Sequence, residues 1–252
     1  MSKAQQYLLL GTITGLISAA LGIGGGGVMI PIMTVFLGYT MKEAVPLSLV
    51  VIIPIATVGG LVHTLSMPQS AQWIAVFLIA AGSIGGTAIG AYLHQHMSNR
   101  YLSLLFSSLL LFSALKLLGV FDLSNGEMIQ FPQWTMIIIG IFAGISSALF
   151  GIGGGLINVP AFTILYGFSM HSAITSSMLA MIITTFSSIF MHRKLSQLQT
   201  DKLQYLIGAA FVSASAGAFL SKQINPSTLK MLFGIFLLYT TFRFLKGVLK
   251  KD

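Results

Sequence analysis

The chain contains no cysteine and very few charged residues, and both absences restrict what it can be. Without cysteine it has no disulfide, no thiolate metal ligand and no thiol nucleophile. Charged residues make up 7% of the 252 positions and hydrophobic residues 55%, and the mean hydropathy is +0.91. A soluble domain of this length needs more polar surface than this composition supplies. The sequence therefore predicts a protein whose solvent is lipid.

Three long stretches lack Asp, Glu, Lys and Arg altogether. They cover residues 4–41, 44–99 and 128–192, and each exceeds the ~20 apolar residues that one membrane crossing requires. The net charge of +8 comes from basic residues at the ends of apolar segments rather than on one face. This distribution indicates membrane topology, and no nucleic acid partner is expected.

The chain is predicted to be two copies of one unit. Residues 11–64 align without gaps with residues 140–193 at an offset of 129, and 17 of the 54 pairs are identical. These pairs include proline, serine and histidine, which composition alone would not match in one register. The predicted organisation is a first membrane repeat at 1–121, a linker at 122–133 and a second membrane repeat at 134–252.

Each unit is expected to begin with an apolar stretch that glycines interrupt, followed by three uninterrupted spans. A continuous helix over the first stretch, residues 7–38, would be about 48 Å long and would exceed a hydrocarbon core of about 30 Å. It must break, either as a re-entrant hairpin that returns to its starting side or as one discontinuous crossing. The uninterrupted spans are expected at 44–65, 72–93, 101–119, 173–192, 203–220 and 229–245.

The lysines and arginines favour the re-entrant hairpin. This arrangement gives three crossings per unit and inverted repeats, with ten basic residues on one side and three on the other. The discontinuous crossing gives parallel repeats and nine against four. Basic residues are enriched on the cytoplasmic side. The expected fold is thus an all-α polytopic protein of a bacterial inner (plasma) membrane, with two inverted repeats and both termini in the cytoplasm.

The glycine runs are the strongest candidates for a site. They read Gly22-Ile-Gly-Gly-Gly-Gly-Val-Met-Ile-Pro31 and Gly151-Ile-Gly-Gly-Gly-Leu-Ile-Asn-Val-Pro160. Unwound backbone at membrane depth requires protein or an aqueous cavity around it. A half-helix that starts after each run directs its N–H groups and positive dipole end at the break, which favours an anion. The backbone candidates are Gly24, Gly25, Gly26, Gly153, Gly154 and Gly155; the alternative is that these glycines only permit tight packing.

Polar side chains near the breaks extend this candidate set. Hydroxyl and amide groups are suitable hydrogen-bond donors for the oxygens of an anion. The candidates are Ser18 and Ser147 before the breaks, Asn158 after the second break, and Ser48, Thr175, Ser176 and Ser177 early in the following spans. A membrane serine also often bonds to its own helix, and both interpretations stay open for Ser18 and Ser147.

A duplicated histidine pair, His63 and His192, ends corresponding spans. A proton-coupling role is one hypothesis. The predicted position near the membrane surface favours another, in which both side chains reach the lipid headgroups. No carboxylate falls inside any expected span, so a cation substrate and carboxylate-based coupling are disfavoured.

At these residues the chain resembles the sulfite exporter TauE/SafE family, also called the toluene sulfonate uptake permease family. The resemblance rests on the two Gly-Ile-Gly-Gly-Gly runs with Pro31 and Pro160, and on Ala173-Ile-Thr-Ser-Ser-Met. It extends over nearly the full length and implies transport of sulfite, organosulfonates or related small organic anions. The first unit has Pro46 and Leu47 where the second has Thr175 and Ser176, so a symmetric ring of hydroxyls is incomplete.

The expected function is therefore secondary transport of a small anion, with that anion and the lipid bilayer as partners and with no cofactor or metal. A passive anion channel is the alternative, since re-entrant half-helices also build pores. A subunit that transports nothing itself also stays open. An intramembrane hydrolase is disfavoured because neither glycine run contains a nucleophile, so no enzyme is expected. The direction of transport, the coupling ion and a homo-oligomeric state are left open.

Overall fold

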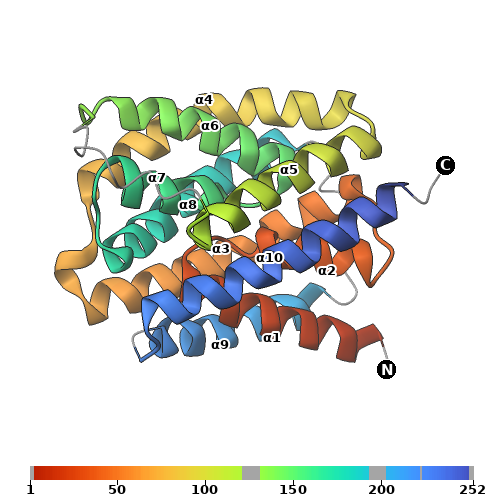
Figure 1. The fold of residues 1–252 in the computed structure, drawn as a ribbon, viewed down its shortest axis with the longest axis horizontal. Coiled ribbons are helices and arrows are strands. Elements are labelled where there is room, and N and C mark those ends of the chain that lie inside the picture. Colours follow the sequence, from red (N-terminus) through yellow and green to blue (C-terminus); the bar gives the residue numbers. More distant parts are fainter. Residues whose placement is uncertain (1–2, 121–130, 193–202, 222, 250–252) are drawn as a thin grey trace.

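The computed structural model describes residues 3–120, 131–192, 203–221 and 223–249 (Figure 1). The first half contains α1 (Lys3–Leu21), α2 (Gly26–Val35), α3 (Met41–Ser66), the 3₁₀ turn η1 (Pro68–Ser70), α4 (Trp73–His96) and α5 (Asn99–Leu117). The second half contains α6 (Thr135–Phe150), α7 (Gly155–Leu165), α8 (Met170–Met191), α9 (Leu203–Leu220) and α10 (Pro226–Leu249). No strand occurs among these residues, and the all-α prediction is confirmed. Most of the expected linker, residues 122–130, lies outside the described residues.

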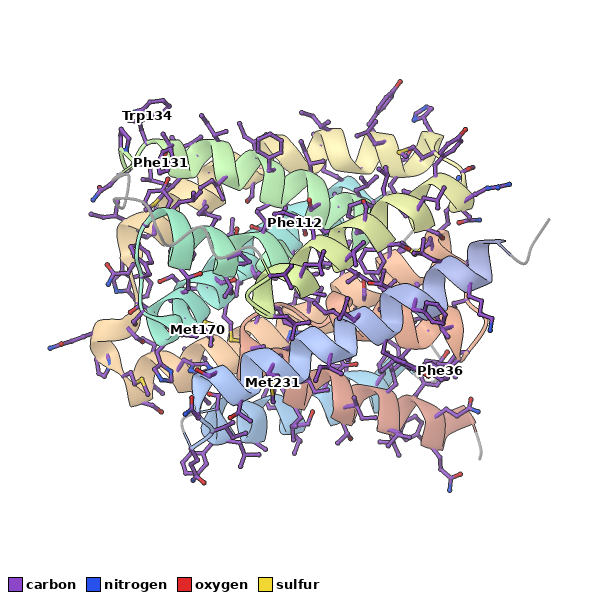
Figure 2. All side chains as sticks on the ribbon, in the orientation of Figure 1. Phe36, Phe112, Phe131, Trp134, Met170 and Met231 are labelled. Carbon is purple, nitrogen blue, oxygen red and sulfur yellow. The ribbon has the colours of Figure 1, made fainter. Side chains whose placement is uncertain are left out.

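The lengths of the helices and their apolar outer surface are those of a membrane protein. Among the described residues, α1, α3, α4, α8 and α9 are long and apolar enough to cross a bilayer. The six uninterrupted spans expected from the sequence coincide with α3, α4, α5, α8, α9 and α10. Large apolar side chains are exposed along the bundle, including Phe77, Phe142 and Phe190. Phe36 and Trp134 are two that Figure 2 labels at the outside of the bundle. Such a surface is stable in contact with hydrocarbon rather than water.

Each predicted glycine break is a real interruption of helix. α1 ends at Leu21 and α2 begins at Gly26, while α6 ends at Phe150 and α7 begins at Gly155. The φ angles are +66° at Gly22, +75° at Gly24, +65° at Gly151, +69° at Gly153 and +84° at Gly154. Side chains with a Cβ rarely adopt this left-handed conformation. The glycines are therefore required by the backbone path itself.

The broken helices are hairpins. The hydroxyl of Tyr7, near the start of α1, is hydrogen-bonded to that of Tyr39, just after α2. The second half repeats this closure between Thr135, at the start of α6, and Tyr166, at the end of α7. Partial burial, and then the bond to Tyr7, raise the pKa of Tyr39, which keeps this phenol protonated. These bonds bring the two ends of each broken stretch together, and the re-entrant arrangement in a membrane stays a prediction.

Corresponding helices of the two halves run in opposite directions. Figure 1 places the N-terminus, where α1 starts, at the same end as the C-terminus, and Figure 2 places Trp134, just before α6, at the other end. The contacts also exchange between halves: α1 packs on α9 and α6 on α4, while α3 packs on α8 and α5 on α10. This arrangement agrees with two inverted repeats.

The isolated glycines allow these helices to approach closely. A methyl group added at Gly82, Gly86 or Gly90 of α4 would overlap a carbonyl oxygen of α6. The same holds for Gly217 of α9 against Leu16 of α1. Small residues at such crossings permit backbone contact in membranes. Each hairpin is thus held against a long helix of the other half.

Candidate functional site

The two glycine breaks meet at the centre of the bundle. A methyl group added at Gly26 would overlap the carbonyl oxygen of Gly151, and one at Gly155 would overlap Ile23. One at Gly24 would overlap the carbonyl oxygen of Ile152. All six glycines predicted for the site are buried. The first helical turns of α2 and α7 therefore start from one shared place.

One serine joins each break to the opposite half. The Ser48 hydroxyl in α3 donates to the carbonyl of Gly151 over 2.8 Å, and the Ser177 hydroxyl in α8 donates to the carbonyl of Gly22 over 2.9 Å. These bonds correspond under the offset of 129 residues. They satisfy carbonyls that the end of a helix leaves unpaired. In this arrangement both hydroxyls are bonded to the backbone, and their role in substrate binding stays a prediction.

Two histidines bind the last turns of the broken helices. His63 Nε2 lies 3.0 Å from the carbonyl oxygen of Ala19, and His192 Nε2 lies 2.7 Å from that of Ala148. Since a carbonyl only accepts, each Nε2 carries a proton. His63 is fully buried and His192 is 5% exposed. The hypothesis that these side chains reach the headgroups is therefore wrong: each one is drawn inward by a carbonyl of its own repeat.

The remaining predicted hydroxyls divide between two places. Ser147 is paired with Ser188 of α8 over 2.8 Å beside the second break. Thr175 is bonded to Ser70 of η1 over 2.9 Å, and Ser176 accepts from the backbone N–H of Gln72 over 3.0 Å. These two residues fix the start of α8 against η1 and α4, and they do not face the breaks.

Four buried polar side chains around the breaks have no hydrogen-bond partner within the described part of the chain. They are Thr14 and Ser18 of α1, Asn158 of α7 and Thr185 of α8. A methyl group added at Gly153 would lie 3.3 Å from Thr185 Oγ1, and one at Gly25 would lie 3.0 Å from Thr14 Cγ2. Buried polar groups in native proteins are nearly always paired. These four unpaired side chains are the distinctive chemical feature of the site.

Sequence reasoning found two of these four residues and missed two. Ser18 and Asn158 were predicted. Thr14 and Thr185 were not, because they lie farther along the chain from the glycine runs and from the starts of the following spans. One signal was available: Thr14 lies four residues before Ser18, which places both on one helical face.

The arrangement offers partial positive charge and hydrogen-bond donors without a cationic side chain. Residues 4–41, 44–99 and 128–192, which supply all the helices around the breaks, contain no Asp, Glu, Lys or Arg. The N-termini of α2 and α7 supply partial positive charge there. The orphan hydroxyls and the Asn158 amide add donors. Among the described residues no cluster of three or more histidine or acidic side chains offers a metal site.

Comparison with known proteins gives consistent results. The family model described as Sulfite exporter TauE/SafE matches residues 2–117 and 136–252. The chain is 25% identical over 258 residues to the probable membrane transporter protein YunE of Bacillus subtilis, covering 92% of this chain and 93% of that protein. It is 33% identical over 110 residues to the probable membrane transporter protein MJ0441 of Methanocaldococcus jannaschii, covering 41% of each.

Proposed function

The chain belongs to the sulfite exporter TauE/SafE family, and from this premise we propose that it is a secondary carrier of a small anion such as sulfite or an organosulfonate. The anion binds where α2 and α7 begin, between the two breaks. One observation carries the proposal: two half-helix N-termini meet beside buried hydroxyl and amide groups that have no partner among the described residues. An anion supplies the acceptor that these donors lack.

The distribution of acidic residues supports an anion over a cation. Glu43 is the one acidic residue within the described helices, and it caps α3 by accepting from the Thr40 N–H over 2.8 Å. Carriers of cations commonly hold the ion with an acidic side chain at depth. The centre of this bundle has none.

In the membrane, the two hairpins are re-entrant and each repeat crosses three times, in an inner (plasma) membrane with both termini in the cytoplasm. The hydrogen bond between the hydroxyls of Tyr7 and Tyr39 supports this, because it places Lys42, three residues after Tyr39, at the same end as Lys3. That grouping belongs to the arrangement with ten basic residues on one side.

Transport requires the breaks to separate, because their backbones touch. The His63 and His192 bonds lie within one repeat, whereas the Ser48 and Ser177 bonds cross between repeats. Movement of one repeat against the other therefore breaks the serine bonds and keeps the histidine bonds. This division permits each hairpin to move as a unit, as in carriers with inverted repeats.

Flux into proteoliposomes tests the proposal. Purified wild-type protein is expected to transport sulfite or an organosulfonate with saturation and trans-stimulation, and Gly25→Leu or Gly154→Leu is expected to abolish flux with membrane insertion intact. The matched control is Gly85→Leu, since a methyl group at Gly85 meets nothing within 4 Å. Normal flux in both break variants contradicts the site. Ion conductance without saturation indicates a channel instead.

A further inference from the structure

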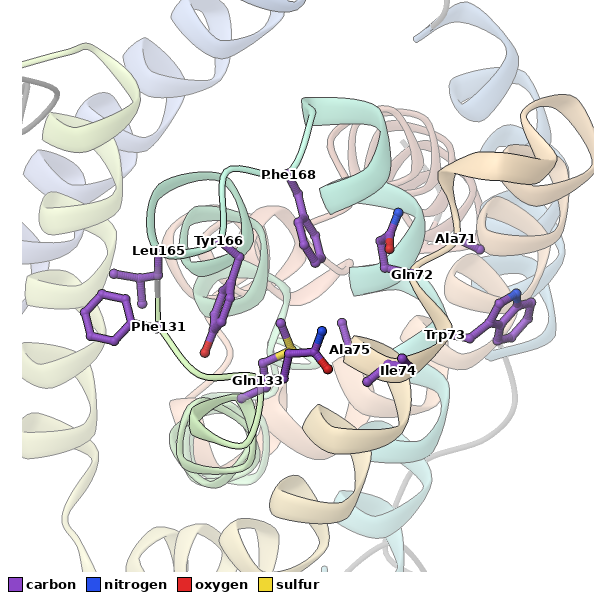
Figure 3. Close-up of a pocket in the computed structure, with 11 residues that line it drawn as sticks. Ala71, Gln72, Trp73, Ile74, Ala75, Phe131, Gln133, Leu165, Tyr166 and Phe168 are labelled. Carbon is purple, nitrogen blue, oxygen red and sulfur yellow. The ribbon is translucent and has the colours of Figure 1, made fainter. Parts of the chain in front are cut away.

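A cavity of about 540 Å³, lined in part by Phe131, lies at the end of the molecule opposite both termini, separate from the breaks (Figures 2 and 3). Three parts of the fold enclose it. Gln72 and Ala75 belong to the start of α4, Gln133 precedes α6, and Tyr166 and Phe168 follow α7. It therefore lies between the two repeats, and its volume suits a small molecule.

The lining combines aromatic walls with two side-chain amides. In Figure 3 the rings of Tyr166 and Phe168 and the amides of Gln72 and Gln133 surround the same space. None of the 11 lining residues is charged. A small inorganic oxyanion would find few hydrogen-bond donors here to replace the water that it gives up. A solute with an apolar body would instead gain from burial against the rings.

Helix ends around the cavity determine the sign of charge that it favours. Both α4, with 24 residues, and α6, with 16, begin here and present their positive ends. α7, with 11 residues, presents its negative end. Two positive ends against one favour a negative head group, for which the glutamine amides are donors.

The cavity is accessible from the membrane–water interface. The chain has two tryptophans, Trp73 and Trp134. Trp73 lines the cavity and Trp134 follows Gln133 directly, and both are more than half exposed. Tryptophan is enriched at the interface level of a bilayer. A solute in water at this end can therefore reach the cavity.

The geometry points to this cavity as a vestibule that binds small organic anions with a planar apolar body. Its role in transport rests on the proposed function, because α7 connects the two places: the helix begins at the break and ends at the cavity, about 15 Å away at 1.5 Å per residue. An organic anion held against the rings of Tyr166 and Phe168 is bound there before it enters the site between the breaks.

Binding of benzoate to the purified full-length protein in nanodiscs, followed by saturation-transfer NMR titration, tests the vestibule without any flux measurement. Benzoate is expected to bind at least about tenfold more tightly than acetate, because of its ring. Gln72→Leu and Gln133→Leu are each expected to weaken benzoate binding about threefold to tenfold through loss of one hydrogen bond. The matched control is Gln69→Leu, an exposed glutamine of η1 that does not line the cavity.

Three results would overturn the vestibule: equal binding of benzoate and acetate, equal effects of all three glutamine variants, or no benzoate binding, which would indicate that lipid occupies the cavity. Asn158→Leu separates this proposal from the proposed function. It is expected to leave benzoate affinity unchanged while it lowers flux. Benzoate binding with the expected glutamine effects but no wild-type flux would uphold the vestibule and refute the carrier. Flux that is sensitive to Asn158→Leu, without benzoate binding, would uphold the carrier and refute the vestibule.

Discussion

The two glycine breaks are held by the same kinds of hydrogen bond but differ in the unpaired polar side chains around them. Both use a serine from the opposite repeat and a histidine from their own repeat, at corresponding positions. The orphan groups show no such symmetry. Asn158 corresponds to Met29, Thr185 to Ala56 and Thr14 to Ala143. The comparison suggests that duplicated residues hold the breaks in place, whereas unduplicated residues provide the chemistry.

The orphan state of Ser18 follows from the same asymmetry. Its counterpart Ser147 is paired with Ser188, and the residue that corresponds to Ser188 is Gly59. A serine that is satisfied in the second repeat is therefore left without a partner in the first. A duplicated residue can acquire a new role when its neighbour changes.

The largest effect is expected where the breaks touch. Gly26→Ala and Gly155→Ala should each abolish flux and lower the thermal stability of the detergent-purified protein, because overpacking costs about 1–3 kcal/mol or more. Gly85→Ala serves as control, since nothing lies within 4 Å of its added methyl group. Wild-type melting of either break variant would show that the breaks tolerate separation.

The second-largest effect on flux is expected at Asn158, and none is expected at its counterpart, Met29. Asn158→Leu should reduce flux at least about tenfold, because a hydrogen bond to a charged group contributes about 1.5–3 kcal/mol. Its thermal stability should stay equal or rise, since an unpaired buried amide is removed. Met29→Leu should change neither. Equal loss of flux in both variants would contradict the division of roles between the two breaks.

Removal of the hydroxyl of Ser48 or Ser177 is expected to lower stability by similar amounts. Ser48→Ala and Ser177→Ala each leave a buried carbonyl unpaired, which costs about 1–3 kcal/mol. Thermal melts should show similar decreases for both variants, and none for Ser108→Ala, which removes an exposed bond within α5. A decrease in one variant alone would mean that the breaks are held unequally.

The smallest effects are expected at two adjacent threonines, Thr184 and Thr185. Thr185→Val should lower flux about twofold to tenfold with unchanged stability, because its hydroxyl has no protein partner. Thr184 donates to Ser83 Oγ over 2.9 Å, so Thr184→Val should lower stability by about 1 kcal/mol. Flux assays and thermal melts on the same preparations give both values. Reversed effects would remove Thr185 from the site.

The sequence predicted the fold better than the site. Glycine runs, charge-free stretches and the internal repeat depend on local pattern, so the helices, the breaks and the pairing of the halves followed from them. The partners of Ser48, Ser177 and the histidines could not be derived, because they depend on which carbonyl each packed helix presents. Their roles in substrate or proton binding stay predictions. Thr14 and Thr185 were missed because the search covered residues next to the breaks and early in the following spans, whereas Thr14 lies eight residues before Gly22 and Thr185 lies in the second half of α8.

The exchange of hairpins between halves has a consequence for the origin of the molecule. α1 packs on α9 and α6 packs on α4, so each hairpin finds its support on a helix encoded in the other half. A five-helix ancestor with this geometry would have had no such support within its own chain. It would have existed only as an antiparallel homodimer, and gene fusion would then have freed its two identical centres to diverge.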